Sequence, residues 1–168
     1  MRCVTLVLGG ARSGKSRFAE SLGQSAQATR TYIATAEAFD TEMQERIARH
    51  RLERGGGWTT VEAPLDLVAA LKSCGEGFVL VDCLTLWLNN LIYRERDIEA
   101  EIGELCAALA ATANDVVLVS NEVGYSIVPE NPLARRFRDE QGLVNQRIAA
   151  VADEVYLVAA GLALPLKR

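Results

Sequence analysis

Short runs of consecutive apolar residues recur along this chain, and segments of helical period separate them. Because the runs are continuous rather than alternating, they are typical of parallel strands that are buried on both faces. The predicted strands are residues 4–8, 31–35, 78–81, 116–120 and 155–159, with 59–62 as a candidate for a further short strand. The predicted helices are residues 15–23, 40–54, 65–72, 84–93, 98–113 and 133–152.

The alternation of strands and helices predicts an α/β fold with a mostly parallel central sheet and helices on both faces. Ligands of such sheets bind at the edge where the carboxyl ends of the strands lie. The length of the chain fits one domain, residues 1–168. Residues with chemical function are therefore expected where the predicted strands end.

A glycine-rich segment follows the first predicted strand and matches the pattern G-x-x-x-x-G-K-[ST]. Its residues are Gly9, Gly10, Ala11, Arg12, Ser13, Gly14, Lys15 and Ser16. The glycines let the backbone turn so that its N–H groups point at phosphate oxygens, and the start of the next helix adds positive charge. Lys15 is expected to reach the β- and γ-phosphates, and the Ser16 hydroxyl to bind Mg²⁺. The motif predicts a P-loop NTPase fold of the RecA-like type.

A second acidic position, Asp82, ends the apolar strand at residues 78–81. A carboxylate at such a strand end can hold Mg²⁺ directly or through water, and a solvated strand-end acid is the alternative. The N-K-x-D motif of regulatory GTPases is absent, and the D-x-x-G match that starts at Asp139 lies inside a predicted helix. Motif and spacing thus indicate a P-loop phosphotransferase or NTPase and no narrower class.

Composition excludes several other classes of protein. The net charge of −4 argues against a nucleic-acid partner, which usually requires a basic excess. The four cysteines form no C-x-x-C pair, so they suggest no zinc site. No apolar run reaches the ~20 residues of a membrane span, and no cationic leader precedes the first strand. We expect a cytoplasmic protein with reduced cysteines.

The only histidine, His50, lies in the charged predicted helix at residues 40–54, with Arg46 and Arg54 one turn away on either side. Nearby cations favour the neutral imidazole, which is a nucleophile, and arginines can neutralise phosphate charge. These residues therefore suit attack of an imidazole on a nucleotide phosphorus. A packing or surface histidine on an amphipathic helix is the alternative.

Five segments together resemble the bifunctional adenosylcobinamide kinase / adenosylcobinamide-phosphate guanylyltransferase family of cobalamin biosynthesis. They read GGARSGKSRFAE from residue 9, YIATAEAFDTEM from residue 32, RIARHRLER from residue 46, VDCLTLWLNNL from residue 81, and SNEVGYSIVPENPLARRFRDEQGLVNQRIAAVADEVYLVAAG from residue 120. The resemblance runs from about residue 4 to residue 161. The VDCLTLWLNNL segment and the NEVG…VPEN…VNQR pattern are far more specific than the glycine-rich loop.

The resemblance implies two reactions. A nucleoside triphosphate, GTP or ATP, phosphorylates the aminopropanol hydroxyl of adenosylcobinamide. GTP then guanylylates His50, and the cobinamide phosphate takes the GMP to give adenosylcobinamide-GDP. The resemblance also implies Mg²⁺ as cofactor and a homotrimer with its sites near subunit contacts. Beside the catalytic Lys15 and the rest of the glycine-rich loop, the implied GTP contacts are Ala34, Thr35, Ala36, Arg51, Leu52, Glu53, Arg54, Glu62 and Asp82.

Two other functions stay open from the sequence: a small-molecule kinase with a structural His50, and a nucleotide-sensing module without turnover. Glu122, which follows the predicted strand 116–120, is a candidate for orienting the cobinamide hydroxyl or the metal shell. A loop acid that caps the next segment is the alternative for Glu122. Arg135, Arg136 and Arg138 are candidates for contacts with substrate phosphate, and solvated helix arginines are the alternative.

Overall fold

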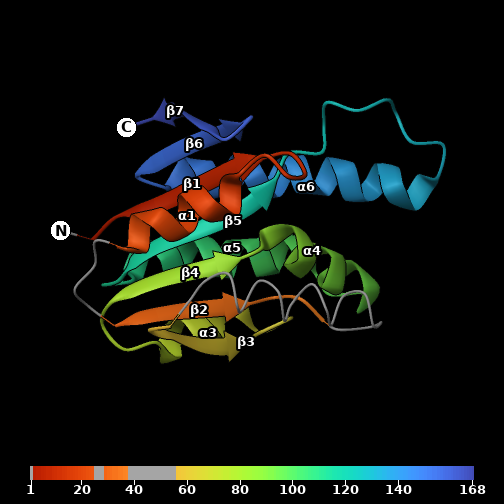
Figure 1. The fold of residues 1–168 in the computed structure, drawn as a ribbon. Helices are drawn as coiled ribbons and strands as arrows, with labels where there is room; N and C mark the ends of the chain where they lie inside the picture. Colours follow the sequence, from red (N-terminus) through yellow and green to blue (C-terminus); the bar gives the residue numbers. More distant parts are fainter. Residues whose placement is uncertain (1, 25–28, 38–55) are drawn as a thin grey trace.

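The computed structural model describes residues 2–24, 29–37 and 56–168 (Figure 1). A seven-stranded sheet of order β3-β2-β4-β5-β1-β6-β7 forms its centre. The strands are β1 (Val4–Gly9), β2 (Arg30–Ala34), β3 (Trp58–Glu62), β4 (Phe78–Asp82), β5 (Asp115–Asn121), β6 (Glu154–Ala159) and β7 (Leu162–Lys167). The β6–β7 pair is antiparallel and the other neighbouring strands are parallel, which confirms the predicted α/β fold.

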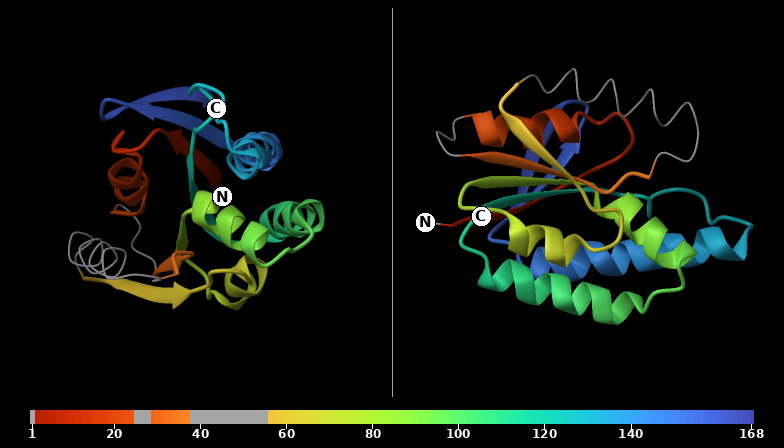
Figure 2. Two further views of the ribbon diagram at one scale, coloured as in Figure 1. Left: turned by 90° about the vertical axis from the view of Figure 1, so that its right-hand side faces the viewer. Right: turned by 90° about the horizontal axis from the view of Figure 1, so that it is seen from below.

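The described helices cover the two faces of the sheet unequally (Figure 2). They are α1 (Lys15–Gln24), α3 (Leu67–Ser73), α4 (Leu84–Tyr93), α5 (Ile98–Ala111) and α6 (Pro132–Val151). The larger group of buried side chains lies between the sheet and α3, α4, α5 and α6, and includes the fully buried Trp87. A smaller group lies on the α1 face, around Val7, Val119 and Ala19. Each face of the sheet therefore has its own apolar core.

The hydrophobic pattern located the predicted strands to within one residue at each end, and the described helices to within two. The reason is that β1, β4 and β5 are buried on both faces, so their runs are mainly apolar and contain no charged residue between the strand ends. Strand β7 was not predicted. It is an exposed edge strand whose apolar run contains Pro165, and proline within a run argues against a strand except at the edge of a sheet. The predicted helix at residues 40–54 lies outside the described residues.

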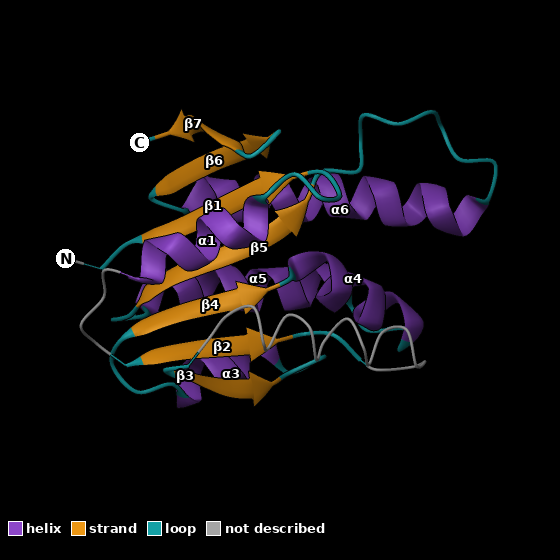
Figure 3. Cartoon of the chain, in the orientation of Figure 1, coloured by secondary structure: helices purple, strands orange, loops and turns teal. Residues whose placement is uncertain are grey.

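All parallel strands end at one edge of the sheet, on the right in Figure 3. Helix α6 and the loop before it extend beyond this edge. The side chain of Asn131 caps α6 by accepting from the N–H groups of Leu133 and Ala134, and Pro132 occupies the first helical position. None of the helices in the described ranges is long and apolar enough to cross a membrane.

Candidate functional site

The glycine-rich loop connects β1 to α1 at the carboxyl edge of the sheet, as its sequence predicts. The N–H of Ser13 donates to the carbonyl of Gly10 at 3.3 Å, which closes a turn within the loop. Arg12 and Gly14 have positive φ values of 54° and 95°. A left-handed conformation costs glycine little but disfavours other residues, so the loop holds its shape at some cost at Arg12. Backbone N–H groups in such a loop are suited to bind phosphate.

The turn between β6 and β7 supports the loop from the side. The N–H of Gly161 donates to the carbonyl of Ser13 at 2.8 Å, and a side chain at Gly14 would lie 3.1 Å from the Cα of Gly161. Residues from the two ends of the chain are therefore packed together at this place. The sequence pattern did not predict this contact, because it depends on the hairpin that β6 forms with β7.

The first residues of α1 carry the side chains that the motif assigns to phosphate and metal. Lys15 begins the helix, and its Nζ donates to the carbonyl of Gly10 at 3.0 Å. Ser16 follows within the first turn, where the helix N-terminus presents unpaired N–H groups and partial positive charge. Both residues are half-buried. This arrangement can hold the phosphates of a nucleotide beside a cation bound by oxygen ligands.

Asp82 ends β4 and lies on the same face of the sheet as α1. The hydroxyl of Tyr32 donates to Oδ2 of Asp82 at 2.9 Å, and Tyr32 belongs to the apolar core on the α1 face. This hydrogen bond orients the carboxylate and leaves Oδ1 for another partner. Mg²⁺ prefers oxygen ligands and is usually bound by one or two protein groups together with phosphate. Asp82 and Ser16 fit that requirement, because both present an oxygen ligand at the carboxyl edge of the sheet.

Thr35 joins the end of β2 to the residue that follows β4. Its hydroxyl donates to the carbonyl of Cys83 at 2.7 Å and accepts from the N–H of Cys83 at 2.8 Å. Thr35 is fully buried, so these bonds are shielded from water. Burial raises the pKa of the Cys83 thiol from 9.0 to about 11, and the negative charge of Asp82 adds to the effect. Thr35 therefore acts on the backbone beside Asp82 rather than through a free side chain.

The remaining predicted contacts among the described residues lie further along the same edge. Glu62 ends β3, and the sheet register aligns it with Ala34 on β2 and Asp82 on β4. Ala36 follows in the half-buried loop after β2. The strand order separates β3 from β1 by β2, β4 and β5, which is about 19 Å at roughly 4.8 Å per strand. Glu62 and the glycine-rich loop therefore face different parts of any one bound ligand.

Strand β5 lies between the two parts of the predicted phosphate site, because it pairs with β1 on one side and β4 on the other. The last residue of β5 is Asn121, and the N–H of Glu122 donates to the carbonyl of Gly9 at 3.1 Å. The carboxylate of Glu122 accepts from the N–H of Gly124 at 2.9 Å. Sequence reasoning noticed Glu122 but missed Tyr32 and Asn121, although both stand within segments that carry the resemblance.

His50, Arg51, Leu52, Glu53 and Arg54, which are predicted to contribute the nucleophile and further GTP contacts, lie outside the described residues. The arginines of α6 are described. Arg135 donates to the carbonyls of Pro129 and Glu130, and Arg138 pairs with the exposed Asp139. Arg135 thus holds the loop before α6 in this structure.

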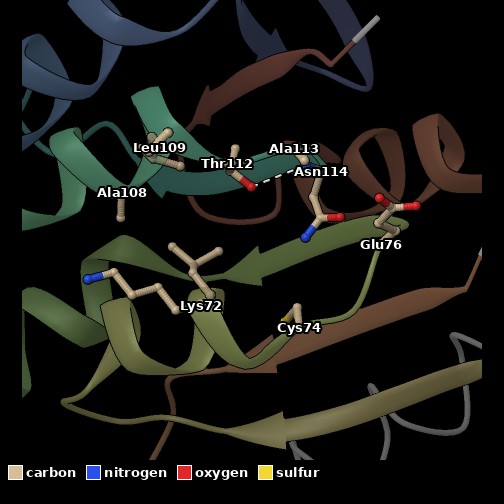
Figure 4. Close-up of a pocket in the computed structure, with 10 residues that line it drawn as sticks. Lys72, Cys74, Glu76, Ala108, Leu109, Thr112, Ala113 and Asn114 are labelled. Carbon is tan, nitrogen blue, oxygen red and sulfur yellow. Dashed lines mark hydrogen bonds between the residues drawn. The ribbon is translucent and has the colours of Figure 1, made fainter.

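A separate pocket of about 280 Å³ lies at the opposite edge of the sheet (Figure 4). Its lining comes from the segments that precede β4 and β5, and includes Lys72, Cys74, Thr112 and Asn114. None of the predicted site residues lines it. It therefore does not belong to the candidate phosphate site.

The loop between β1 and α1, together with the acid at the end of β4, defines a P-loop nucleotide-binding protein. The solved structure of a prototypical ATPase from a bacterial type III secretion system shares the fold, with a TM-score of 0.56 and 10% identity over 97% of this chain and 56% of that one. At that identity the likeness concerns the fold alone.

The sequence comparisons define the family. The chain belongs to the cobinamide kinase / cobinamide phosphate guanyltransferase family, whose model matches residues 5–166. It is 46% identical over 166 residues to the bifunctional adenosylcobalamin biosynthesis protein CobP of Pseudomonas aeruginosa, with 96% of each chain covered. It is 44% identical over 180 residues to the bifunctional protein CobU of Salmonella typhimurium, covering 96% of this chain and 98% of that protein. The predicted resemblance is confirmed.

Proposed function

We propose that this protein phosphorylates the aminopropanol hydroxyl of adenosylcobinamide with a nucleoside triphosphate and then transfers GMP from GTP to the product. The observation that carries the proposal is the family match over residues 5–166, which spans both the glycine-rich loop and His50. Relatives at 44–46% identity are named as bifunctional enzymes of adenosylcobalamin biosynthesis.

In the first reaction, the hydroxyl oxygen of adenosylcobinamide attacks the γ-phosphorus. The bond from that phosphorus to the β–γ bridging oxygen breaks, and a nucleoside diphosphate leaves. The carboxylate of Glu122, at the sheet edge beside Gly9, orients the hydroxyl and accepts its proton. Lys15 and the N–H groups of the loop neutralise charge on the phosphates. Bound Mg²⁺, held by Ser16 and Asp82, would supply further charge neutralisation.

In the second reaction, a neutral imidazole nitrogen of His50 attacks the α-phosphorus of GTP, and pyrophosphate leaves. A phosphate oxygen of the cobinamide phosphate then attacks the same phosphorus, the N–P bond breaks, and the imidazole is released. The covalent intermediate divides one difficult transfer into two easier steps. We assign Arg51, Leu52, Glu53 and Arg54 to GTP binding beside His50, and Ala34, Thr35, Ala36 and Glu62 to contacts along the carboxyl edge.

The test is covalent labelling with GTP that carries a radioactive α-phosphate. We expect an acid-labile, alkali-stable label on the wild-type protein with Mg²⁺, and no label on His50→Ala. The same variant should still phosphorylate adenosylcobinamide, because the kinase step does not use His50 as nucleophile. Absence of label on stoichiometric wild-type protein would remove the guanylyltransferase proposal. Loss of both activities in a folded His50→Ala variant would contradict the separate roles.

We further propose that the chain acts as one domain within a cytoplasmic homotrimer. Several large apolar side chains near the carboxyl edge support a subunit contact, since Tyr125, Ile127 and Val128 are 86%, 94% and 61% exposed. The free state of all four cysteines agrees with a reducing compartment. Light scattering at several protein concentrations measures the oligomeric state, and a monomer at micromolar concentration would contradict the homotrimer.

A further inference from the structure

Asn121 occupies the position between the two parts of the phosphate site. The sheet register pairs it with Gly9, the residue at which β1 enters the glycine-rich loop. On the other side of β5, Asp82 pairs with Val119, two residues before Asn121. Along the strand direction, Asn121 is therefore level with the start of the glycine-rich loop and two residues nearer the carboxyl edge than Asp82. No strand neighbour from β4 reaches it.

The side chain of Asn121 lies on the same face of the sheet as α1. Its neighbour Ser120 lies on the opposite face, where its hydroxyl donates to Asn145 of α6. Successive side chains of a strand alternate between faces, so Asn121 lies on the α1 face, like Val119. Asp82 lies on this face as well, through its bond to Tyr32. The carboxamide is thus placed between the phosphate loop and the predicted metal ligand.

The backbone groups of Asn121 that have no partner on β4 are hydrogen-bonded by side chains from two helices. Its N–H donates to Oγ1 of Thr85 at 2.8 Å, and Thr85 lies in the first turn of α4. Its carbonyl accepts from Nδ2 of Asn145 at 3.2 Å. Thr85 and Asn145 are both buried. Because both backbone groups are bound, the direction of the Asn121 side chain is restricted.

A buried polar cluster on the opposite face of the sheet supports the backbone position of Asn121. Nε2 of Gln141 donates to Oγ of Ser120 at 3.0 Å and to Oδ1 of Asn145 at 3.1 Å. Ser120 and Gln141 are fully buried. Oε1 of Gln141 is the one buried atom of this cluster with no hydrogen-bond partner among the described residues. Hydrogen-bonded polar networks in a core favour one conformation over others. By contrast, the carboxamide of Asn121 itself makes no hydrogen bond with any of the described residues, so it is available to a ligand.

We propose that Asn121 is a catalytic residue of the kinase step, whose Nδ2 donates a hydrogen bond to a γ-phosphate oxygen of the bound triphosphate. This inference rests on the proposed function. In the transition state of phosphoryl transfer, negative charge is spread over the three equatorial oxygens of the γ-phosphate. A hydrogen-bond donor held in a fixed position beside one of these oxygens stabilises the transition state. The donor changes no covalent bond. Thr85 is a positioning residue, which acts through the backbone of Asn121.

The experiment compares phosphorylation of adenosylcobinamide by the wild type, Asn121→Ala and Asn121→Asp at saturating GTP and Mg²⁺. Loss of one such donor lowers kcat by roughly 10²-fold. We expect that loss in Asn121→Ala, and at least as large a loss in Asn121→Asp, since a carboxylate has no N–H and repels phosphate. The affinity for GDP should stay within about twofold, because GDP has no γ-phosphate. Gln24→Ala, which removes an exposed amide at the far end of α1, should retain the wild-type kcat.

Thr85 supplies a second, matched pair of variants. Thr85→Ser keeps the hydroxyl that accepts from Asn121 and should retain most of the rate, whereas Thr85→Val removes it and should lower kcat by about tenfold without weakening GDP binding. If wild-type protein fails to phosphorylate adenosylcobinamide, the proposed function is wrong. If the wild type is active and a folded Asn121→Ala or Asn121→Asp variant keeps kcat within threefold, the role of Asn121 is wrong. Equal losses in kcat and GDP affinity would also overturn it, since they indicate a displaced loop.

Discussion

The two parts of the phosphate site lie at one edge of the sheet, but they are built in different ways. The glycine-rich loop is a continuous segment of eight residues, and most of its expected contacts with phosphate come from backbone N–H groups. The part around Asp82 is assembled from β2, from β4 with the adjoining α4, and from β5, three regions that are far apart in the sequence. In this second part, side chains make the contacts, as in the Tyr32–Asp82 and Thr85–Asn121 bonds.

This difference leads to different sensitivities to mutation. In the loop, a substitution is expected to lower stability or activity when the new side chain overlaps the space that the backbone occupies. In the part around Asp82, a change matters when it removes one hydrogen-bonding atom. Three mutations separate these two kinds of dependence, and two further experiments test the burial of Cys83 beside Asp82. They follow in order of decreasing expected effect.

The largest effect is expected from Gly9→Ala. A Cβ at this position would overlap Oγ of Ser13 and lie 2.6 Å from the carbonyl oxygen of Val158. Overpacking of this kind costs about 1–3 kcal/mol, and we expect the upper end, because one of the clashing atoms is backbone. Urea unfolding without nucleotide measures the free energy of unfolding. Gly10→Ala is the matched control, since nothing lies within 4 Å of its added Cβ. Equal stabilities of the two variants would show that space at Gly9 is not limiting.

The next effect is expected from Thr35→Val, which keeps the shape of the side chain and removes its hydroxyl. The N–H of Cys83 would lose its partner in a buried position, at a cost of about 2 kcal/mol, while the carbonyl of Cys83 would keep the N–H of Trp87 at 3.2 Å. Thr35→Ser retains the hydroxyl and should lose less than half as much. Thermal unfolding of both variants, read together with kinase activity, measures the difference. A Thr35→Val variant as stable as the wild type would contradict the importance of these bonds.

A smaller effect is expected from Tyr32→Phe, which removes the hydroxyl that donates to Asp82. A hydrogen bond to a charged group contributes about 1.5 kcal/mol or more, which corresponds to roughly a tenfold change. Because that bond orients the carboxylate, we expect the Mg²⁺ concentration for half-maximal kinase activity to rise by about that factor. Affinity for nucleotide measured without Mg²⁺ should not change. An unaltered Mg²⁺ dependence would show that Tyr32 does not position the metal ligand.

The smallest effect on activity is expected from iodoacetamide at pH 8. Because burial raises the pKa of Cys83 to about 11, its thiolate is about a hundredfold scarcer at this pH than that of a thiol with a pKa of 9.0. Native protein should therefore keep Cys83 unmodified and remain active, as peptide mass spectrometry can show. Rapid alkylation of Cys83 in active protein would contradict its burial.

The same pKa has a consequence for stability at alkaline pH. The folded-state pKa of Cys83 is raised above its ordinary value of 9.0, so the folded protein keeps its proton where the unfolded chain loses it. This contribution to the free energy of unfolding is fully present below pH 9 and is lost as the pH rises from 9 to about 11. Replacing Cys83 with Ala should make unfolding less dependent on pH in that window.

Most of the fold was predictable because its strongest signals are local. The runs that became β1, β4 and β5 are mainly apolar, as burial on both faces favours. Strand β7 was missed because Pro165 stands within its apolar run, and proline argues against a strand except at the edge of a sheet. Of the site, the loop and Asp82 could be predicted, while Tyr32 and Thr85 could not. Both residues lie within segments that carry the resemblance, but the hydrogen bond of each to the site reaches a partner more than thirty positions away, which no local pattern reports.

The sequence by itself determined the glycine-rich loop, the strand that precedes it, the helix that follows it and the family of the chain. Those features are encoded by consecutive residues, because glycine conformation and side-chain periodicity act over a few positions. Only the tertiary structure decided that β5 lies between β1 and β4, and so brought Asn121 between the loop and Asp82. Strand order depends on how whole elements pack, and no single segment of the sequence specifies that order.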